Sequence, residues 1–559
     1  VSAAAGTALP AAVDGVITLE NGTYVMSEDT TATIKVPNGK NATLDLNGKT
    51  LTNKTGEHTI IVENGATLTI TGNGIVDNVS HGKGAIVNSG EVTLNGGTFK
   101  RSAEKGTYSP NGNGGNSWYT IANYGTMEIN TGVTVENAGG YSSMTRNGGD
   151  VTADCNLTIE GGNFAGGINT VKNDSFGVLT INGGNFSNTA QYVIMNWNKA
   201  EITAGTFRTL DTASAVLFTS AYGGDANTIG KLSISGGEFK HASDTQEMIV
   251  DHYDETNKGN AVVTGGKFDA DISKYIPTDY VQSADGTVEK LGETNAVAKV
   301  GGTYYKTLAD AVAAAQDGDT ITLLKDAELT STLNLAKNIT IDGQGKYTIK
   351  AANSFTVGSD NKTYCVLYVS GEVTLKDVTV NGNEKCRVIF CDKGKLTIDG
   401  ATITNGKAPN FIGGVYMTSS ASFEMKSGSI TGNKNAKGYQ NDEYLQYSSD
   451  LWIGANANGA LTAINGGTIG NVFVNANAWS ASNPGSFTMN GGTVTNLYVE
   501  HDANYGATFK YNDGTIEHLY LSKENGNGQS IEVTPVKGVI YNGGVKEQDL
   551  VTLTMKYND

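Results

Sequence analysis

The chain has 559 residues, with 73 glycines against only 7 prolines, 17% charged residues and 38% hydrophobic residues. This composition excludes a disordered polar tract, which would carry more proline and fewer β-branched residues, and it predicts a turn-rich β protein. The formal net charge of -17 leaves no basic surface that could neutralise phosphates, so we expect no nucleic acid partner.

The start of the chain and its apolar content bear on its location. The opening residues, Val-Ser-Ala-Ala-Ala, are typical of a site near a removed export signal, although a cloning boundary would look the same. No apolar stretch approaches the roughly 20 residues that a membrane-spanning helix needs. We therefore expect a secreted, extracellular protein without membrane insertion.

Four cysteines are spread along the chain and form no C-x-x-C pair. They are Cys155, Cys365, Cys386 and Cys391. No histidine lies at zinc-ligand spacing from them, so a metal cluster is not expected. On successive coils of a solenoid, Cys365 and Cys386 would lie about two residues out of register, too far apart for an unstrained disulfide. The sequence therefore predicts mostly free thiols.

One repeated unit dominates the chain: apolar, polar, apolar, polar, Gly, Gly, polar, Phe. Residues 157–164 (LTIEGGNF) and 179–186 (LTINGGNF) show it most clearly. The alternation predicts a half-buried strand, and the Gly-Gly pair predicts a sharp corner. One unit cannot bury its own apolar face, but stacking each unit on the next buries it and pairs the strands in parallel. This pattern predicts a parallel β-helix.

The repeat is interrupted once, and a helix is predicted just after the interruption. Residues 268–280 depart from the repeat, and residues 307–316 (TLADAVAAAQ) form a short helical pattern with Thr307 as the N-cap. Such a helix would cover the open end of a second solenoid. We therefore predict an all-β chain of two right-handed parallel β-helix domains in tandem, residues 1–291 and 292–559, with a capping helix near 307–316.

The helical segment and its surroundings carry a family resemblance. Residues 301–326 (GGTYYKTLADAVAAAQDGDTITLLKD) resemble the opening of β-helix modules in cell-wall-anchored surface proteins of Gram-positive, often gut-dwelling, bacteria. Residues 42–51 and 268–280 look like the first coil and the exit segment of the same module. The resemblance implies a pectate-lyase-like parallel β-helix at a bacterial cell surface or cell wall. It leaves the ligand open.

Parallel β-helices also include polysaccharide-degrading enzymes, so we searched for catalytic sets. The sequence contains no motif typical of polygalacturonases, and arginine, the base in related lyases, occurs only four times. The best catalytic candidates are Asp251, His252 and Asp254, where a histidine is flanked by carboxylates suited to acid–base work. A polar loop between coils explains this segment better, and an enzyme is therefore the less favoured interpretation.

Calcium is the other cofactor that the sequence brings into question. Residues 317–319 and 512–514 carry Asp and Asn next to Gly, and such clusters supply oxygen ligands. Turn formation explains both clusters better, so we expect neither a metal nor another cofactor.

Two long insertions between coils, residues 101–124 and 438–452, are rich in aromatic residues. Loops that project from a rigid solenoid are common binding sites, and aromatic faces beside Asn and Asp suit sugars as well as proteins. The predicted ligand-binding residues are Tyr108, Trp118, Tyr119, Tyr439, Tyr444, Tyr447 and Trp452. Alternatively, these rings only pack each loop onto the solenoid.

These observations favour a non-enzymatic adhesion or ligand-binding module that recognises a glycan or a host or microbial surface protein through its inter-coil loops. The first alternative is a glycoside hydrolase or lyase of the β-helix class. The second is a structural spacer.

Overall fold

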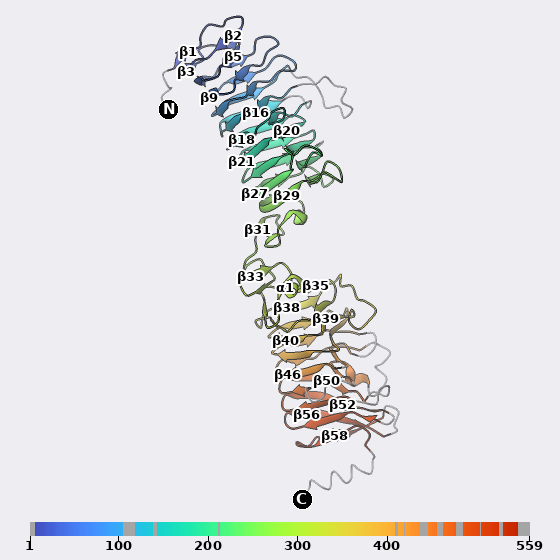
Figure 1. Cartoon of the computed structure of the whole chain (residues 1–559). Helices are drawn as coiled ribbons and strands as arrows, with labels where there is room; N and C mark the ends of the chain where they lie inside the picture. The colour runs from blue at the N-terminus through green and yellow to red at the C-terminus, as the bar shows by residue number, and fades with distance from the viewer. Residues whose placement is uncertain are drawn as a thin grey trace. The chain divides into compact units, whose positions relative to one another are not determined.

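The computed structural model describes residues 6–103, 118–137, 142–210, 213–408, 412–418, 420–435, 445–454, 462–476, 484–502, 505–524 and 529–545. The chain divides into two compact units, Val1–Lys290 and Leu291–Asp559. In each unit, strands of successive coils pair in parallel to build long sheets (Figure 1). The predicted all-β fold of two parallel β-helices is confirmed.

Three strands make each regular coil of unit 1. One coil contains β18 (Cys155–Ile159), β19 (Asn163–Gly166) and β20 (Asn169–Asn173), and the next contains β21 (Gly177–Ile181), β22 (Asn185–Asn188) and β23 (Tyr192–Asn196). The first two strands of each coil join a 19-stranded sheet, and the third joins a 10-stranded sheet. Corresponding positions of the repeat are paired in register, as Leu157 with Leu179 and Phe164 with Phe186.

The repeat forms this coil because each of its positions has a distinct physical role. Leu179 and Ile181 are buried in the core. Gly184 has a φ of 106°, and a Cβ there would lie 3.1 Å from the Gly162 carbonyl oxygen, so the corner requires glycine. The phenylalanines after these corners stack with ring centroids 4.5 to 4.8 Å apart. They are Phe164, Phe186, Phe207, Phe239 and Phe268.

The 10-stranded sheet of unit 1 carries the residues that matter below. Its strands are β2 (Val16–Thr18), β5 (Thr33–Val36), β8 (Ile60–Val62), β11 (Ile86–Asn88), β14 (Ile121–Asn123), β17 (Thr145–Asn147), β20, β23, β26 (Ala215–Thr219) and β28 (Glu247–Val250). Each strand is short, and a turn follows it at one corner of the coil.

The predicted helix lies near the start of unit 2, after the short strands β32 (Ala298–Val300) and β33 (Thr303–Tyr305). Helix α1 (Leu308–Ala314) is slightly shorter than the predicted 307–316, and Thr307 Oγ1 accepts a hydrogen bond of 3.0 Å from the Asp310 amide. Leu308, Ala311 and Val312 are buried, and the helix packs beside β32, β33 and β34 (Thr320–Leu323) (Figure 1). The helix ends before Gly318, whose φ is 91°.

A 14-stranded sheet of unit 2 contains a long row of parallel strands. The row consists of β36 (Leu333–Leu335), β39 (Cys365–Val369), β42 (Arg387–Cys391), β45 (Val415–Met417), β48 (Leu451–Ile453), β50 (Thr468–Val474), β52 (Thr493–Val499) and β56 (Thr515–Ser522). The antiparallel strand β57 (Ser530–Val533) pairs with β56.

All four cysteines are buried and unpaired, which confirms the prediction of free thiols. Burial raises the pKa of Cys365, Cys386 and Cys391 to about 12. Across the described ranges, no helix has both the length and the apolar character needed to cross a membrane.

Candidate ligand-binding ridge

Outward side chains of the 10-stranded sheet line up along the axis of unit 1. Strand register pairs Arg146 with Lys172, Lys172 with Met195, and Met195 with Phe218. Neighbouring parallel strands lie about 4.8 Å apart, so these side chains form one column. Turns at the ends of the same strands add Tyr124, Asp150, Asp174, Trp197, Tyr222 and Tyr253. We call this set, together with Arg146 and Lys172, the corner ridge.

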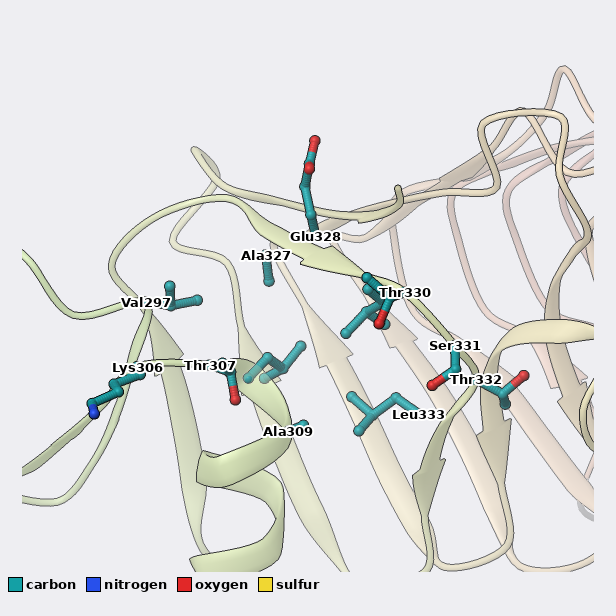
Figure 2. Close-up of a pocket in the computed structure, with 12 residues that line it drawn as sticks. Val297, Lys306, Thr307, Ala309, Ala327, Glu328, Thr330, Ser331, Thr332 and Leu333 are labelled. Atoms are coloured by element: carbon teal, nitrogen blue, oxygen red, sulfur yellow. The ribbon is translucent and has the colours of Figure 1, made fainter. Parts of the chain in front are cut away.

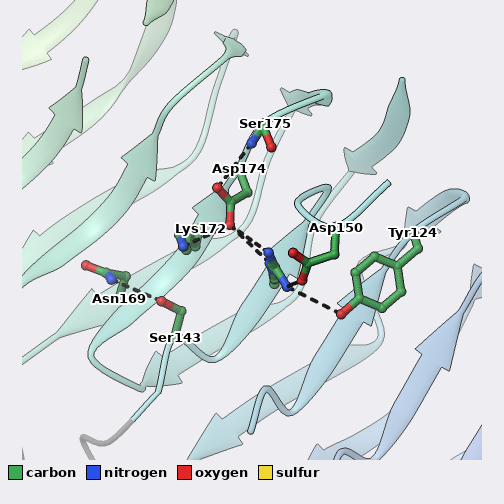
Figure 3. Close-up of polar contacts among 8 residues, drawn as sticks. Tyr124, Ser143, Asp150, Asn169, Lys172, Asp174 and Ser175 are labelled. Atoms are coloured by element: carbon green, nitrogen blue, oxygen red, sulfur yellow. Dashed lines mark hydrogen bonds and ion pairs between the residues drawn. The ribbon is translucent and has the colours of Figure 1, made fainter. Parts of the chain in front are cut away.

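A charged cluster forms one end of the corner ridge (Figure 3). Arg146 is only 8% exposed. Its Nη1 lies 3.0 Å from Asp150 Oδ2, and its Nη2 lies 3.0 Å from Asp174 Oδ2. Lys172 Nζ lies 2.8 Å from the same Asp174 oxygen. Two cations and two carboxylates are thus held together, with Asp174 shared by both cations.

Aromatic rings complete the surroundings of Arg146. Its Cζ lies 5.1 Å from the ring centroid of Tyr119 and 5.8 Å from that of Tyr124, within the range of cation–π attraction. Burial raises the pKa of both tyrosines, although the attraction of Arg146 acts in the opposite direction. Both phenols are therefore neutral at physiological pH.

The electrostatic balance keeps the cluster ionised. Burial alone would raise the pKa of Asp174, but the attraction of Lys172 and Arg146 outweighs it and holds this pKa below its ordinary value. Burial lowers the pKa of Arg146, yet the nearby Tyr119 and Asp174 raise it more. Asp174 and Arg146 are consequently both charged at neutral pH.

The loop after β17 needs glycine at two positions, because side chains there would leave no room for this cluster. Gly149 has a φ of 99°, and a Cβ there would collide with the Arg146 guanidinium. Gly148 also has a positive φ, of 80°. The Gly-Gly pair therefore lets the backbone pass directly over the arginine and turn Asp150 back onto it.

An aromatic platform forms the other end of the corner ridge. The Trp197 ring lies 5.0 Å from Phe218, 5.5 Å from Tyr222 and 5.7 Å from Tyr253, measured between ring centroids. Trp197 is 7% exposed, whereas Tyr222 is 54% and Tyr253 is 62% exposed. The tryptophan thus supports two tyrosine rings that face solvent.

Hydrogen bonds fix the loop that carries Tyr253. The Tyr253 amide donates to Ser220 Oγ at 3.0 Å, and Ser220 Oγ donates to the Asn257 carbonyl at 2.6 Å. Asp254 Oδ1 accepts from the amides of Thr256 and Asn257 at 2.9 and 3.0 Å. The platform therefore stands on an ordered turn.

The predicted catalytic candidates lie beside this platform. His252 Nδ1 is 3.2 Å from Asp251 Oδ1. Hydrogen bonds from the Thr256 side chain and the following turn lower the pKa of Asp254 to about 2. A carboxylate that is so strongly held in its ionised form caps a turn well and serves poorly as a general acid.

The first predicted binding loop leads to the corner ridge. Trp118 is half-buried, and its ring centroid lies 4.4 Å from His58 and 5.5 Å from Tyr119. Tyr119 in turn faces Arg146. Of the predicted aromatic residues, Tyr119 therefore lies against the charged cluster, and Trp118 lies beside Tyr119. Tyr108, from the same insertion, lies outside the described residues.

The second predicted loop is arranged differently from our expectation. Trp452 lies on strand β48 rather than on a loop, is 8% exposed and stacks on Phe473 at 4.3 Å. Tyr447 stacks on Tyr520 at 4.5 Å. The alternative interpretation, in which rings pack the inserted segment onto the solenoid, describes both residues. Tyr439 and Tyr444 lie outside the described residues.

The two calcium candidates are held in turns. Asp317 Oδ1 accepts from the Asn338 amide at 2.8 Å, and Asp319 Oδ2 accepts from the Gln316 amide at 2.7 Å. Asp513 forms an ion pair with Lys537. Within the part of the chain that the structure describes, no three His, Cys, Asp or Glu residues are grouped as metal ligands.

A pocket in unit 2 lies between helix α1 and the first coils (Figure 2). Its volume is 240 Å³, and its lining includes Val297, Leu308, Leu333 and Thr330. Figure 2 shows the Glu328 carboxylate directed away from these residues. The polar part of the lining consists mostly of hydroxyl groups, with Lys306 and Glu328, and the corner ridge is the stronger candidate site.

Most residues of the corner ridge were not predicted from the sequence. Arg146, Lys172 and Asp174 come from different coils, and their pairing depends on the strand register. The scarcity of arginine was the available signal, because Arg146 is one of only four arginines in the chain.

We compared the chain with known proteins. No protein-family model matches it, and no curated protein matches it. Among solved structures, it is similar to a mutant of the PL6 family alginate lyase AlyGC, with 13% identity, 90% of this chain and 86% of that chain covered, and a TM-score of 0.20. The unmutated lyase gives 12% identity, 92% and 87% coverage, and a TM-score of 0.19. Likenesses this weak carry no argument about activity, and the fold rests on the strand pairings described above.

Proposed function

We propose that the chain is a non-enzymatic, carbohydrate-binding module of a bacterial surface protein and that it holds a glycan along the corner ridge of unit 1. The observation that carries this proposal is the pair of solvent-facing rings, Tyr222 and Tyr253, supported by the buried Trp197. The C–H faces of sugars stack on such rings, while their hydroxyl groups need nearby polar partners.

The length of the ridge suits an oligosaccharide better than a single sugar. From Arg146 on β17 to the end of β28, the ridge spans four inter-strand steps, or about 19 Å. Charged groups at one end and aromatic rings at the other would contact different units of the same chain. A rigid sheet below the ridge lowers the entropic cost of binding, because little of the protein must become ordered.

The proposed location follows from the resemblance of residues 301–326 to modules of Gram-positive surface proteins. An extracellular glycan-binding module on a gut bacterium would contact host or microbial polysaccharides. The glycans that the protein binds in a screen test whether it contacts host or microbial polysaccharides.

One observation favours a second function, a glycan-active enzyme. The His252–Asp251 pair, at 3.2 Å, lies beside the aromatic platform and has the composition of an acid–base pair. Incubation with acidic and mucin polysaccharides distinguishes the two functions, because an enzyme would release products and Asp251→Asn would abolish the release. A structural spacer would neither bind nor cleave.

The test of the binding function is a glycan array probed with the full chain, followed by calorimetric titration of the best ligand. We expect Tyr222→Ala and Tyr253→Ala each to weaken binding about tenfold, the equivalent of one good stacking contact. Tyr304→Ala, at a half-buried tyrosine in unit 2, is the matched control and should bind like the parent. Binding that both platform variants retain in full would refute the assignment.

A further inference from the structure

Arg146 makes two carboxylate contacts that differ sharply in exposure. The side chain of Asp174 is 17% exposed, and that of Asp150 is 89% exposed. Asp174 also binds Lys172 and the Ser175 amide, so three neighbours hold it. Among the described residues, Arg146 is the one partner of the Asp150 carboxylate.

The contact of Asp150 with Arg146 is therefore exchangeable. The Asp150 carboxylate is exposed to solvent although Arg146 is buried, so water competes for this carboxylate, and holding it in place costs side-chain freedom. Asp150 follows two glycines with positive φ, and it belongs to no strand. Removal of its side chain from Arg146 leaves the rest of the cluster in place.

When Asp150 moves away from Arg146, the net charge of the remaining cluster determines which group can take its place. Arg146 and Lys172 carry two positive charges against the single negative charge of Asp174. Asp174 occupies the Nε and Nη2 donors of Arg146, so an incoming carboxylate would accept a charge-assisted hydrogen bond from Nη1, where Asp150 now binds. The Tyr119 and Tyr124 rings beside Arg146 add faces on which a sugar ring can pack.

We propose that the glycan bound by the corner ridge contains a sugar with a carboxylate, and that this carboxylate replaces Asp150 on Arg146 while neighbouring sugars stack on Tyr222 and Tyr253. Asp150 then serves as an internal competitor that occupies the guanidinium in the free protein. This inference rests on the proposed glycan-binding function and narrows it to acidic glycans.

The test compares three oligosaccharides of equal length: one built of uronic acid units, its carboxyl-reduced counterpart and a sulfated neutral chain. Calorimetric titration of the full chain should show at least tenfold tighter binding of the uronic acid oligomer than of the reduced one. Stronger binding of the sulfated chain than of the uronic acid chain would overturn the carboxylate assignment.

Two variants test the exchange itself. Asp150→Asn removes the competing charge and should tighten binding of the acidic oligomer about threefold to tenfold, whereas Arg146→Lys should weaken it at least tenfold because the Nη1 donor of the guanidinium is lost. Asp154→Asn, at an exposed position of the same loop, is the matched control and should leave affinity unchanged. Thermal melts show whether Arg146→Lys still folds, and Asp150→Asn provides an independent readout if it does not.

The binding measurements distinguish the carboxylate exchange from the glycan binding on which it rests. Binding of neutral and acidic glycans with equal affinity, lost in Tyr253→Ala but unchanged in Asp150→Asn, would overturn the carboxylate exchange and leave glycan binding intact. Absence of binding to any glycan would overturn both.

Discussion

A ladder of buried asparagines runs through unit 1, one residue to a coil. Each side-chain amide donates to the side-chain oxygen of the next at 2.8 Å, and all five residues are fully buried. They are Asn88, Asn123, Asn147, Asn173 and Asn196. Each amide also donates to backbone carbonyls nearby, such as Asn147 Nδ2 to the Val178 oxygen of β21 at 3.1 Å. The ladder therefore satisfies the buried hydrogen-bonding groups at the corner of the coil that carries the corner ridge.

Removal of one rung should destabilise the whole unit. Asn147→Ala leaves Asn123 without its acceptor and Asn173 without its donor inside the protein, so we expect a loss of about 2–4 kcal/mol in the free energy of unfolding. Urea unfolding followed by circular dichroism measures it. Asn130→Ala breaks a similar bond to Asn95 on the exposed face and should cost under about 0.5 kcal/mol. Equal losses in the two variants would contradict the structural role of the ladder.

The buried thiols predict a simple chemical behaviour. Because burial raises the pKa of Cys365, Cys386 and Cys391 to about 12, almost none of these groups is a thiolate at pH 8. The folded chain should therefore not react with dithiobisnitrobenzoate at pH 8 within an hour, whereas the chain in guanidinium should react at once. Thr152→Cys, at an exposed position, should add one fast-reacting thiol and serves as the positive control. Rapid labelling of the folded parent would show that these coils open.

At the scale of elements, unit 2 carries a column of aromatic rings on the outside of its strand row. Strand register aligns them on seven consecutive strands: Tyr368, Phe390, Tyr416, Trp452, Phe473, Tyr498 and Tyr520. Five of the seven are less than a tenth exposed, although they point away from the solenoid core. Tyr447, on the short 3-10 helix at Leu445–Ser448, covers Tyr498 and Tyr520. The column is a second apolar layer that anchors inter-coil segments.

This second layer predicts that Trp452 stabilises the fold. Trp452→Ala should lower the free energy of unfolding of unit 2 by about 3 kcal/mol, since a large buried ring is lost from a packed stack. Tyr253→Ala, at the exposed platform of unit 1, should lower stability by less than about 1 kcal/mol. Denaturant titrations of the two variants make the comparison. A Trp452→Ala variant as stable as the parent would return this residue to the ligand-binding candidates.

The strands of the fold could be predicted from the sequence because the repeat encodes them locally. In residues 179–186, alternation places Leu179 and Ile181 inward, and Gly184 marks the corner without reference to any other coil. The aromatic column and the corner ridge could not be predicted in this way. Trp452 lies in a short apolar strand in which inward and outward positions look alike, and Arg146 meets Asp174 only through the strand register. The asparagine ladder could not be predicted from the sequence either, because a single polar residue at the end of a strand is also typical of a turn.

At the scale of the whole molecule, each unit has a core of its own. The core of unit 1 ends with residues such as Phe268, Ile272 and Tyr275, which close its last coil. The core of unit 2 begins with Ala298 and Leu308, where helix α1 covers the first coil. Each solenoid therefore has a capped end within the chain, as stacked repeats require for solubility.

Two capped cores predict that residues 1–290 and 291–559 fold when each is made alone. Each half should unfold within a few degrees of its transition in the full chain, as measured by differential scanning calorimetry. In the full chain, Asn147→Ala should shift only the transition of the first unit, and Trp452→Ala only that of the second, because the two residues belong to separate units. A half that is unfolded alone, or a single variant that shifts both transitions equally, would show that the two units depend on each other for stability.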